Sequence, residues 1–330
     1  MIARRLGAVL AAAALIVGAV FARRALDDED AAADDDPPVD VVPTTLLCIT
    51  ELRAACLAVA ADHPELEVTV EDAGRTLDRL AVLADPDEAS LWATLEPFPA
   101  MVDVLRTTGG LALIEADVAP IAATRTAIAL PSGARDDLLL AECADGALWR
   151  CVGDAAGVAW TEIGSDTDLG TVRPALGDVE SSASALASFA AAMAGYFDDP
   201  DISRTRWEAD PDFVGWLRPL ARAVRTDQLS AGTPLATMVT RRGALDVAAT
   251  TDAEAADVRA SGQAFDIQYP EPSMWVEAVL AVPAGVAAPD DLATDLTAAL
   301  TTWTPTDQAG TALPDAGTMI ALRTLWGDAT

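Results

Sequence analysis

The chain has 330 residues and a formal net charge of −31. This acidity excludes nucleic-acid binding, because no basic stripe is available to meet the phosphates. Every basic residue is Arg, and Lys and Asn are both missing, a bias typical of GC-rich coding or of adaptation to high salt. A chain of this length is long enough to bury a large core in two lobes.

An apolar run lies close to the N-terminus, at residues 6–22, with an arginine pair on each side. As a helix this run spans about 25 Å, and flanking arginines reach the interfaces of a hydrocarbon core about 30 Å thick. We expect residues 1–24 to be a membrane anchor that leaves the folded body extracytoplasmic, at the cell membrane. The alternative is a cleaved signal peptide and a secreted protein.

An acidic spacer follows, at residues 25–43, with eight acidic residues among Ala and Pro. Such a composition buries too little apolar surface to fold, so we predict a disordered linker. The folded body is expected to begin at about Thr44.

Strands and helices then alternate. We predict strands at Thr44–Ile49, Leu66–Val70 and Leu91–Glu96, and helices at Glu51–Asp62 with Thr50 as its N-cap, from Gly74 through Thr76 to Leu83, and at Pro99–Thr107. This rhythm is typical of βαβ units that build a parallel sheet.

The four cysteines form two pairs of identical spacing, Cys48 with Cys56 and Cys143 with Cys151. Three pairings are open to four cysteines. The local ones are favoured, since Cys48 near the end of a strand and Cys56 on the next helix come level where helix packs on sheet. Zinc binding is the competing reading, but the spacing does not match zinc knuckles and His63 is the only histidine. We therefore predict two disulfides, which also suit an exported protein.

The stretch Gly170–Phe197 reads as a strand end, a turn, and a helix opened by a serine cluster. Ser181 is the expected N-cap, because its hydroxyl can accept from an unpaired N–H of the first turn. Apolar residues at helical spacing, among them Phe189 and Met193, predict one buried face.

A family resemblance rests on the order of several short motifs. After the first strand and helix, His63-Pro64-Glu65-Leu66-Glu67-Val68-Thr69-Val70 resembles the opening of type 2 periplasmic binding proteins, the extracellular solute-binding proteins of ABC importers. Ser181-Ser182-Ala183-Ser184 is similar to a degenerate form of the family's Ser-x-Thr-Gly turn, without its Thr and Gly. Asp246-Val247-Ala248 and the run Phe265–Pro270 are similar to the family's return strands. The resemblance covers about Thr44 to Trp326.

The resemblance implies an α/β fold of two lobes, each a mostly parallel sheet flanked by helices, behind the N-terminal membrane helix. Lobe 1 would comprise residues 44–125 and 270–330, and lobe 2 residues 126–269. On this template we expect a crossover strand at Ile121–Leu130, a loop at Cys143–Cys151, helices at Phe213–Val224, Thr233–Thr240 and Asp290–Trp303, strands at Ala244–Thr250, Phe265–Tyr269 and Trp275–Val282, and a C-terminal tail on lobe 1.

The implied function is capture of a small polar or anionic solute between the lobes, at the carboxyl ends of the strands, for an ABC importer with a membrane permease as partner. Hydroxyls and helix N-termini suit an anion or a carboxylate, and Arg75 or Arg173 would balance its charge. The positional candidates for ligand binding are Thr50, Glu51, Thr76, Glu96, Ser181, Ser182 and Tyr269.

Other classes of protein remain as alternatives. The same fold can serve as a non-transporting sensor or a protein-docking module. A von Willebrand A-type adhesion domain needs an Asp-x-Ser-x-Ser metal loop after its first strand, whereas that strand here ends in Cys48-Ile49-Thr50. We expect no enzyme, because the chain has neither a Gly-x-Ser-x-Gly elbow nor a P-loop. No cofactor and no metal are expected.

Overall fold

The computed structural model describes residues 44–85, 88–107, 112–114, 118, 120–143, 147–223, 229, 232–306 and 311–330. The predicted membrane anchor at 1–24 and the linker at 25–43 lie outside these residues. None of the described helices combines the length and the apolar character that crossing a membrane requires.

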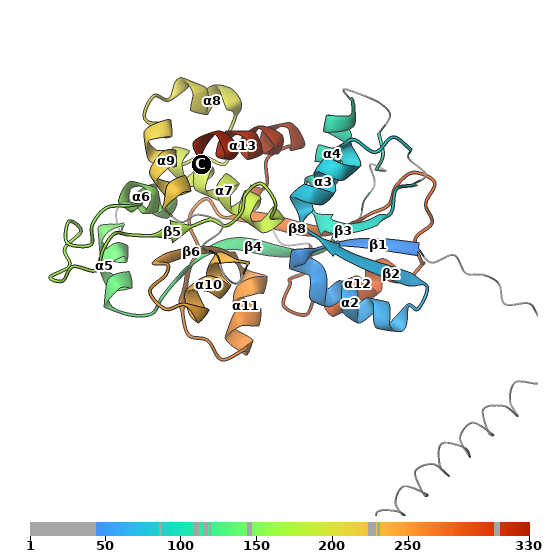
Figure 1. The fold of residues 1–330 in the computed structure, drawn as a ribbon, viewed down its shortest axis with the longest axis horizontal. Coiled ribbons are helices and arrows are strands. Elements are labelled where there is room, and N and C mark those ends of the chain that lie inside the picture. Colours follow the sequence, from blue (N-terminus) through green and yellow to red (C-terminus); the bar gives the residue numbers. More distant parts are fainter. Residues whose placement is uncertain are drawn as a thin grey trace, which may run out of the picture. The chain divides into compact units, whose positions relative to one another are not determined.

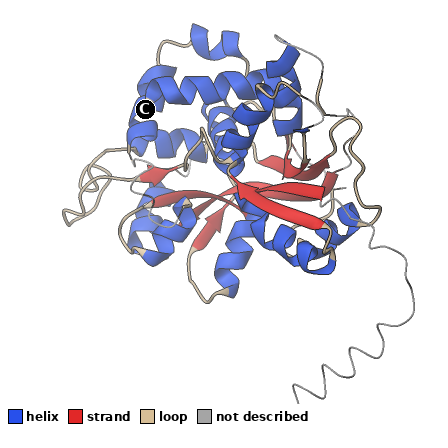
Figure 2. Cartoon of the chain, turned by 45° about the vertical axis from the view of Figure 1, so that its right-hand side comes forward, coloured by secondary structure: helices blue, strands red, loops and turns tan. Residues whose placement is uncertain are grey.

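The described strands form one sheet with helices on both faces (Figures 1 and 2). The strands are β1 (Thr44–Ile49), β2 (Leu66–Glu71), β3 (Leu91–Leu95), β4 (Pro120–Leu130), β5 (Pro174–Ala175), β6 (Val247–Thr251), β7 (Asp266–Gln268), β8 (Met274–Ala281) and β9 (Thr311–Ala312). Their order across the sheet is β2-β1-β3-β8-β4-β6-β5, with β7 paired to β4 and β9 paired to β8.

The first three strands confirm the predicted parallel βαβ start. β1 runs parallel to both β2 and β3, with Leu46 beside Val68 on one side and beside Leu91 on the other. All five residues of β3 are buried, as expected of a strand covered by helices on both faces.

One strand, β4, carries the sheet from one half of the chain to the other. Its residues 120–125 pair with β8, and its residues 126–130 pair with β6 and β7, always antiparallel. We call residues 44–125 and 270–330 the first half and residues 126–269 the second half, after the predicted boundaries. The prediction of a mostly parallel sheet is wrong for the second half, where only β5 and β6 are parallel. The cause is that β4 is antiparallel to each of the strands with which it pairs, β6, β7 and β8.

Helices fill the connections between the strands. They are the short 3-10 helix η1 (Thr50–Leu52), then α2 (Arg53–Asp62), α3 (Ala73–Ala81), α4 (Phe98–Thr107), α5 (Ala134–Glu142), α6 (Leu148–Ala155), α7 (Ala183–Phe197), α8 (Arg204–Ala209), α9 (Phe213–Arg222), α10 (Pro234–Thr240), α11 (Asp252–Ala260), α12 (Leu292–Ala299) and α13 (Ala316–Ala329). The predicted loop over residues 143–151 is wrong, because α6 forms there and buries Trp149 and Val152. Thr50 is not a helix cap either, since it lies inside η1.

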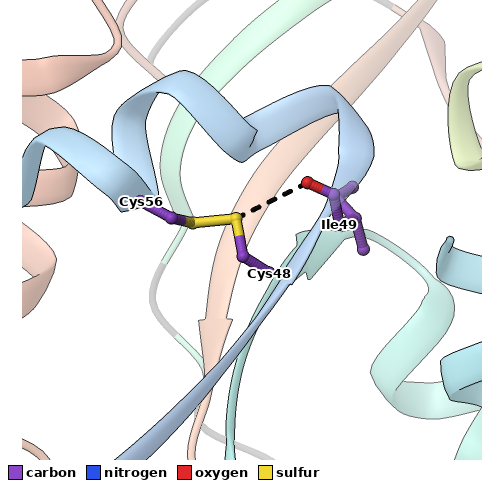
Figure 3. Close-up of a disulfide and its surroundings, with 3 residues drawn as sticks. All are labelled: Cys48, Ile49 and Cys56. Atoms are coloured by element: carbon purple, nitrogen blue, oxygen red, sulfur yellow. Dashed lines mark hydrogen bonds between the residues drawn. A yellow bond between two sulfur atoms is a disulfide. The ribbon is translucent and has the colours of Figure 1, made fainter. Parts of the chain in front are cut away.

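Both predicted disulfides are present. Cys48 of β1 is bonded to Cys56 of α2, as Figure 3 shows, and Cys143 at the end of α5 is bonded to Cys151 of α6. The contact of 3.5 Å between Cys48 Sγ and the Ile49 carbonyl oxygen is not a donated hydrogen bond, because a disulfide sulfur carries no hydrogen. Each bond closes a short local loop.

Helix α7 is buried all round, not on one face as predicted. Every residue from Ala185 to Tyr196 is buried. Its many alanines let neighbouring elements approach closely, and it packs against α6, α13, β4, β6 and β8. A helix that is apolar all round belongs to the centre of a protein.

The C-terminal helix α13 contacts both halves. It packs on α4 of the first half and on α7 and α9 of the second. The ring of Trp326 meets Phe189 of α7 edge-on, with 5.0 Å between the ring centroids. We predicted that the tail packs on lobe 1. The tail does contact α4 there, but its apolar side chains also pack on α7 of the second half.

The contact between α6 and α9 supplies a test of this packing. A methyl group at Gly153 would overlap the indole of Trp216, whose Nε1 donates to the Arg150 carbonyl at 2.9 Å. We expect Gly153→Ala to lower the free energy of unfolding by about 1–3 kcal/mol, measured by urea denaturation. The control is Gly215→Ala on the exposed side of α9, where a methyl group meets nothing within 4 Å. It should be neutral or stabilising by up to about 1 kcal/mol. Equal stability of both variants would contradict the described packing.

The only histidine joins α2 to α12. His63 Nδ1 lies 2.9 Å from Glu65 Oε1, and its Nε2 lies 2.8 Å from Asp295 Oδ2. The hydrogen bond to Asp295, and then the one to Glu65, raise the pKa of the imidazole above 6.5. His63 is thus a structural residue held between two carboxylates.

This arrangement predicts a pH-dependent stability. Because the pKa is higher in the folded chain, the contribution of His63 is complete below about pH 6.5 and is lost as the pH rises through the folded pKa. The wild type should therefore lose more melting temperature than His63→Gln between pH 6 and pH 9. Nuclear magnetic resonance of the single imidazole gives the folded pKa directly. Parallel stability curves for the two proteins would contradict the prediction.

Candidate functional site

The carboxyl ends of several strands open toward one region of the molecule. Glu51 follows β1, Asp72 follows β2, Glu96 follows β3, and Asp252 follows β6. In doubly wound folds ligands bind beyond these strand ends, so we begin with the contacts made there.

Glu51 of the first half accepts hydrogen bonds from the N-terminus of α7 in the second half. Its Oε1 receives the Ser182 hydroxyl at 2.9 Å, the Ser184 N–H at 3.0 Å and the Ser184 hydroxyl at 3.2 Å. Its Oε2 is buried and has no hydrogen-bond partner among the described residues. A carboxylate at this place is favoured by the unpaired N–H groups and by the helix dipole.

Ser182, not Ser181, caps α7. The Ser182 Oγ accepts from the Ala185 N–H at 3.1 Å, so the predicted cap is displaced by one residue. Ser181 instead accepts a hydrogen bond at its carbonyl oxygen from the Gly74 N–H, at 2.8 Å. Gly74 is required there, because a side chain would overlap the Glu180 carbonyl.

Arg323 of α13 ties the same loop to α3. Its two terminal nitrogens donate to the carboxylate of Asp78 at 2.6 and 2.8 Å, and its Nε donates to the Glu180 carbonyl at 2.7 Å. Two parallel bonds between Arg and a carboxylate fix geometry as well as charge. The first and second halves are thus joined by protein atoms alone.

A small polar cavity lies beside the cap of α7. Its volume is about 20 Å³, enough for about one water molecule. Hydroxyl-bearing and acidic residues are among those that line it: Asp178, Ser182, Ser184, Ser188, Thr233, Thr250 and Glu254.

Glu254 is one of two acidic residues that line this cavity, the other being Asp178. It accepts from the Thr233 hydroxyl at 2.5 Å and from the Thr250 hydroxyl at 2.8 Å. Burial is the main cause that raises the pKa of its carboxyl group, and the negative charge of Glu51 adds to it. The charge of Glu51, in the first half, therefore acts on a carboxyl group of the second half.

Arg125, Asp252 and Tyr269 form a second cluster, where the pairing partners of β4 change. The guanidinium carbon of Arg125 lies 3.5 Å from the centroid of the Tyr269 ring, and its Nε lies 3.6 Å from Asp252 Oδ2. The Tyr269 hydroxyl donates to Asp252 Oδ1 at 2.5 Å. Burial, and then the bond to Asp252, raise the pKa of Tyr269.

The remaining predicted residues make other contacts. The Thr50 hydroxyl donates to Asp72 Oδ1 at 2.8 Å, and the buried Thr76 donates to Glu71 Oε2 at 2.8 Å. Burial, and then the charge of Glu277, raise the pKa of Glu96. Of the predicted set, only Glu51 and Ser182 bond directly to each other.

Sequence reasoning missed Ser184, Glu254, Asp252 and Arg125. Ser184 lies within the quoted serine motif, so its spacing from Ser182 was a usable signal. Glu254 lies in the first turn of α11, which has Thr251 as its cap. We did not predict this helix, and therefore did not select Glu254. Arg173, one predicted source of positive charge, is engaged by Asp246 and by the Gly243 carbonyl.

No cluster of His, Cys, Asp and Glu suited to a metal ion occurs within the described ranges. The arrangement offers hydrogen-bond acceptors on carboxylates, donors on hydroxyls and a helix N-terminus. Such groups can bind a polar molecule through hydrogen bonds.

Comparisons with known proteins give the fold. No protein-family model and no curated protein matches the chain. Three solved structures resemble it across 87% of its length. They are the periplasmic binding protein AfuA from Actinobacillus pleuropneumoniae, with fructose-6-phosphate bound (TM-score 0.56, 12% identity, 98% of that chain covered), the ferric binding protein from Campylobacter jejuni (0.53, 9%, 99%) and the periplasmic binding protein MotA from A. tumefaciens, in complex with glucopine (0.53, 10%, 98%).

The chain therefore has the type 2 periplasmic-binding-protein fold that the sequence resemblance predicted. The three proteins named above are binding proteins, and what this chain shares with them is the fold.

The neighbouring serines provide a matched pair for testing the cap. Ser182→Ala removes the acceptor for the Ala185 N–H and should lower the free energy of unfolding by about 1 kcal/mol. Ser181→Ala leaves its carbonyl bond to Gly74 intact and should change stability by less than half as much. Urea denaturation of both variants decides. A larger loss for Ser181→Ala would return the cap to the residue that the sequence favours.

Proposed function

We propose that this protein captures a small polar or anionic solute between its two halves, outside the cytoplasm, and delivers it to the permease of an ABC importer. The fold shared with periplasmic binding proteins supports this role. In the proposal, residues 6–22 anchor the chain in the cell membrane, and the lobes meet at residues 125/126 and 269/270.

The observation that carries the proposal is the contact between Glu51 and α7. Residues 131 positions apart meet where the strands of the first half end and the central helix of the second half begins. A solute placed there touches both halves at once, so its binding free energy favours their closed arrangement.

Within the proposed site the predicted residues take different roles. Glu51, Ser182 and Tyr269 present polar atoms near the junction of the halves, Ser181 precedes Ser182 in the chain, and Glu96 follows β3. Thr50 and Thr76 give their hydroxyls to carboxylates of their own half and would position those groups.

The second candidate function is a sensor or protein-docking module with the same fold. The Arg323 clamp favours it, because it joins the halves without any solute. In that case the halves stay together and no small molecule stabilises the chain.

A thermal-shift screen separates the two functions. The full-length protein in mild detergent is heated with sugars, polyols, amino acids, amines and oxyanions, each at matched ionic strength. A solute at 100 times its dissociation constant should add about 2.7 kcal/mol to the free energy of unfolding. A response to one chemical class supports solute capture. No response across the whole panel would overturn it in favour of docking.

A further inference from the structure

Glu51 holds the place that an anion would take. The N-terminus of a 15-residue helix, with hydroxyls of Ser182 and Ser184 beside it, is a typical cradle for a carboxylate or a phosphate. Here one oxygen of Glu51 already accepts from both hydroxyls and from the Ser184 N–H. The chain thus supplies its own anion to this cradle.

The charges nearby act against a second anion. Glu254 lines the cavity beside the cradle and experiences the charge of Glu51. The negative charge of Glu51, which already acts on Glu254, would act equally on any further anion placed here, since like charges repel. Two arginines near the region already face carboxylates, Arg125 that of Asp252 at 3.6 Å and Arg323 that of Asp78 at 2.6 Å.

At the cradle itself, the unused hydrogen-bonding capacity is that of an acceptor. Glu51 Oε2 is buried, and it lacks a partner in the part of the chain that the structure describes. A buried carboxylate oxygen is stabilised by an N–H or O–H donor and destabilised by another acceptor.

From these contacts we infer that Glu51 determines the specificity of the site, by excluding anionic solutes and selecting a neutral or cationic solute rich in O–H or N–H groups. This inference rests on the proposed function, and it narrows the polar or anionic class to its polar, non-anionic part. Glu51 acts as a built-in competitor, since any anion must first displace a carboxylate that the chain itself holds in place.

Chemical rescue tests the inference. Glu51→Ala removes the carboxylate and leaves space at the α7 N-terminus, which acetate fits in shape and charge. Sodium acetate should then raise the melting temperature of full-length Glu51→Ala, while sodium chloride at equal ionic strength does not. Acetamide, neutral and of the same shape, should bind at least tenfold more weakly than acetate.

The controls are the wild type and Glu67→Ala. Glu67 is an exposed carboxylate on β2, so its removal changes the net charge equally without touching the cradle. Neither protein should respond to acetate beyond the chloride baseline. If Glu51→Ala does not fold even in acetate, Glu51→Ser replaces it under the same readings.

Two results would overturn the inference. One is stabilisation of the wild type by acetate, sulfate or phosphate beyond the chloride baseline, which would still support solute capture. The other is a folded variant at position 51 that acetate does not stabilise. If the proposed function is wrong, no solute in the thermal-shift screen stabilises the wild type. The acetate rescue of the Glu51 variant can still be measured in that case.

Discussion

The fold depends on a single long strand that belongs to both halves of the chain. β4 hydrogen-bonds to β8 along its first part and to β6 and β7 along its second, so the sheet is continuous across the junction. Because backbone bonds must be satisfied on each side, neither half can form its inner edge without this strand. The groups that lie near the change of partners, Arg125 and Tyr269 among them, are therefore positioned by the backbone itself.

Two helices, α7 and α13, complete the junction between the two halves. α7 is an alanine-rich helix at the centre, and its N-terminus faces the first half. α13 is the last helix of the chain, yet it lies against helices of both halves. Apolar burial on α7 and the hydrogen bond from Arg323 Nε to the Glu180 carbonyl thus act on the same loop, residues 178–182, from two sides. The candidate site is built where these constraints meet.

Much of the first half could be predicted from sequence, because β1, β2 and β3 alternate with helices and carry clear apolar patterns. The local disulfides followed from spacing and from the reach of a strand and its next helix. In the second half the predicted helices at Phe213–Val224 and Thr233–Thr240 and the predicted strands at Ala244–Thr250 and Phe265–Tyr269 are confirmed as α9, α10, β6 and β7, and prediction failed for other elements. Among them are β5, which has only two residues, and α6 and α11, which pack on elements distant in sequence, α6 on α7 and α9 and α11 on β4.

The candidate site shows the same division. Position along the fold identified Glu51 and the serine motif, since strand ends and helix starts can be read locally. What could not be read was the bond between them, which depends on how the two halves meet. We had expected an anionic ligand at the N-terminus of α7. The carboxylate of Glu51, which had been chosen as a ligand contact, occupies that place instead.

The first disulfide has a consequence for that carboxylate. Glu51 lies inside the loop that Cys48 and Cys56 close, so it sits on a segment whose two ends are held together by a covalent bond. The freedom of this segment is lost when the bond forms, not each time the halves meet. The side chain is thereby preorganised, and little further ordering opposes its docking on α7. Oxidative folding and the electrostatic character of the site are thus linked through one turn of chain.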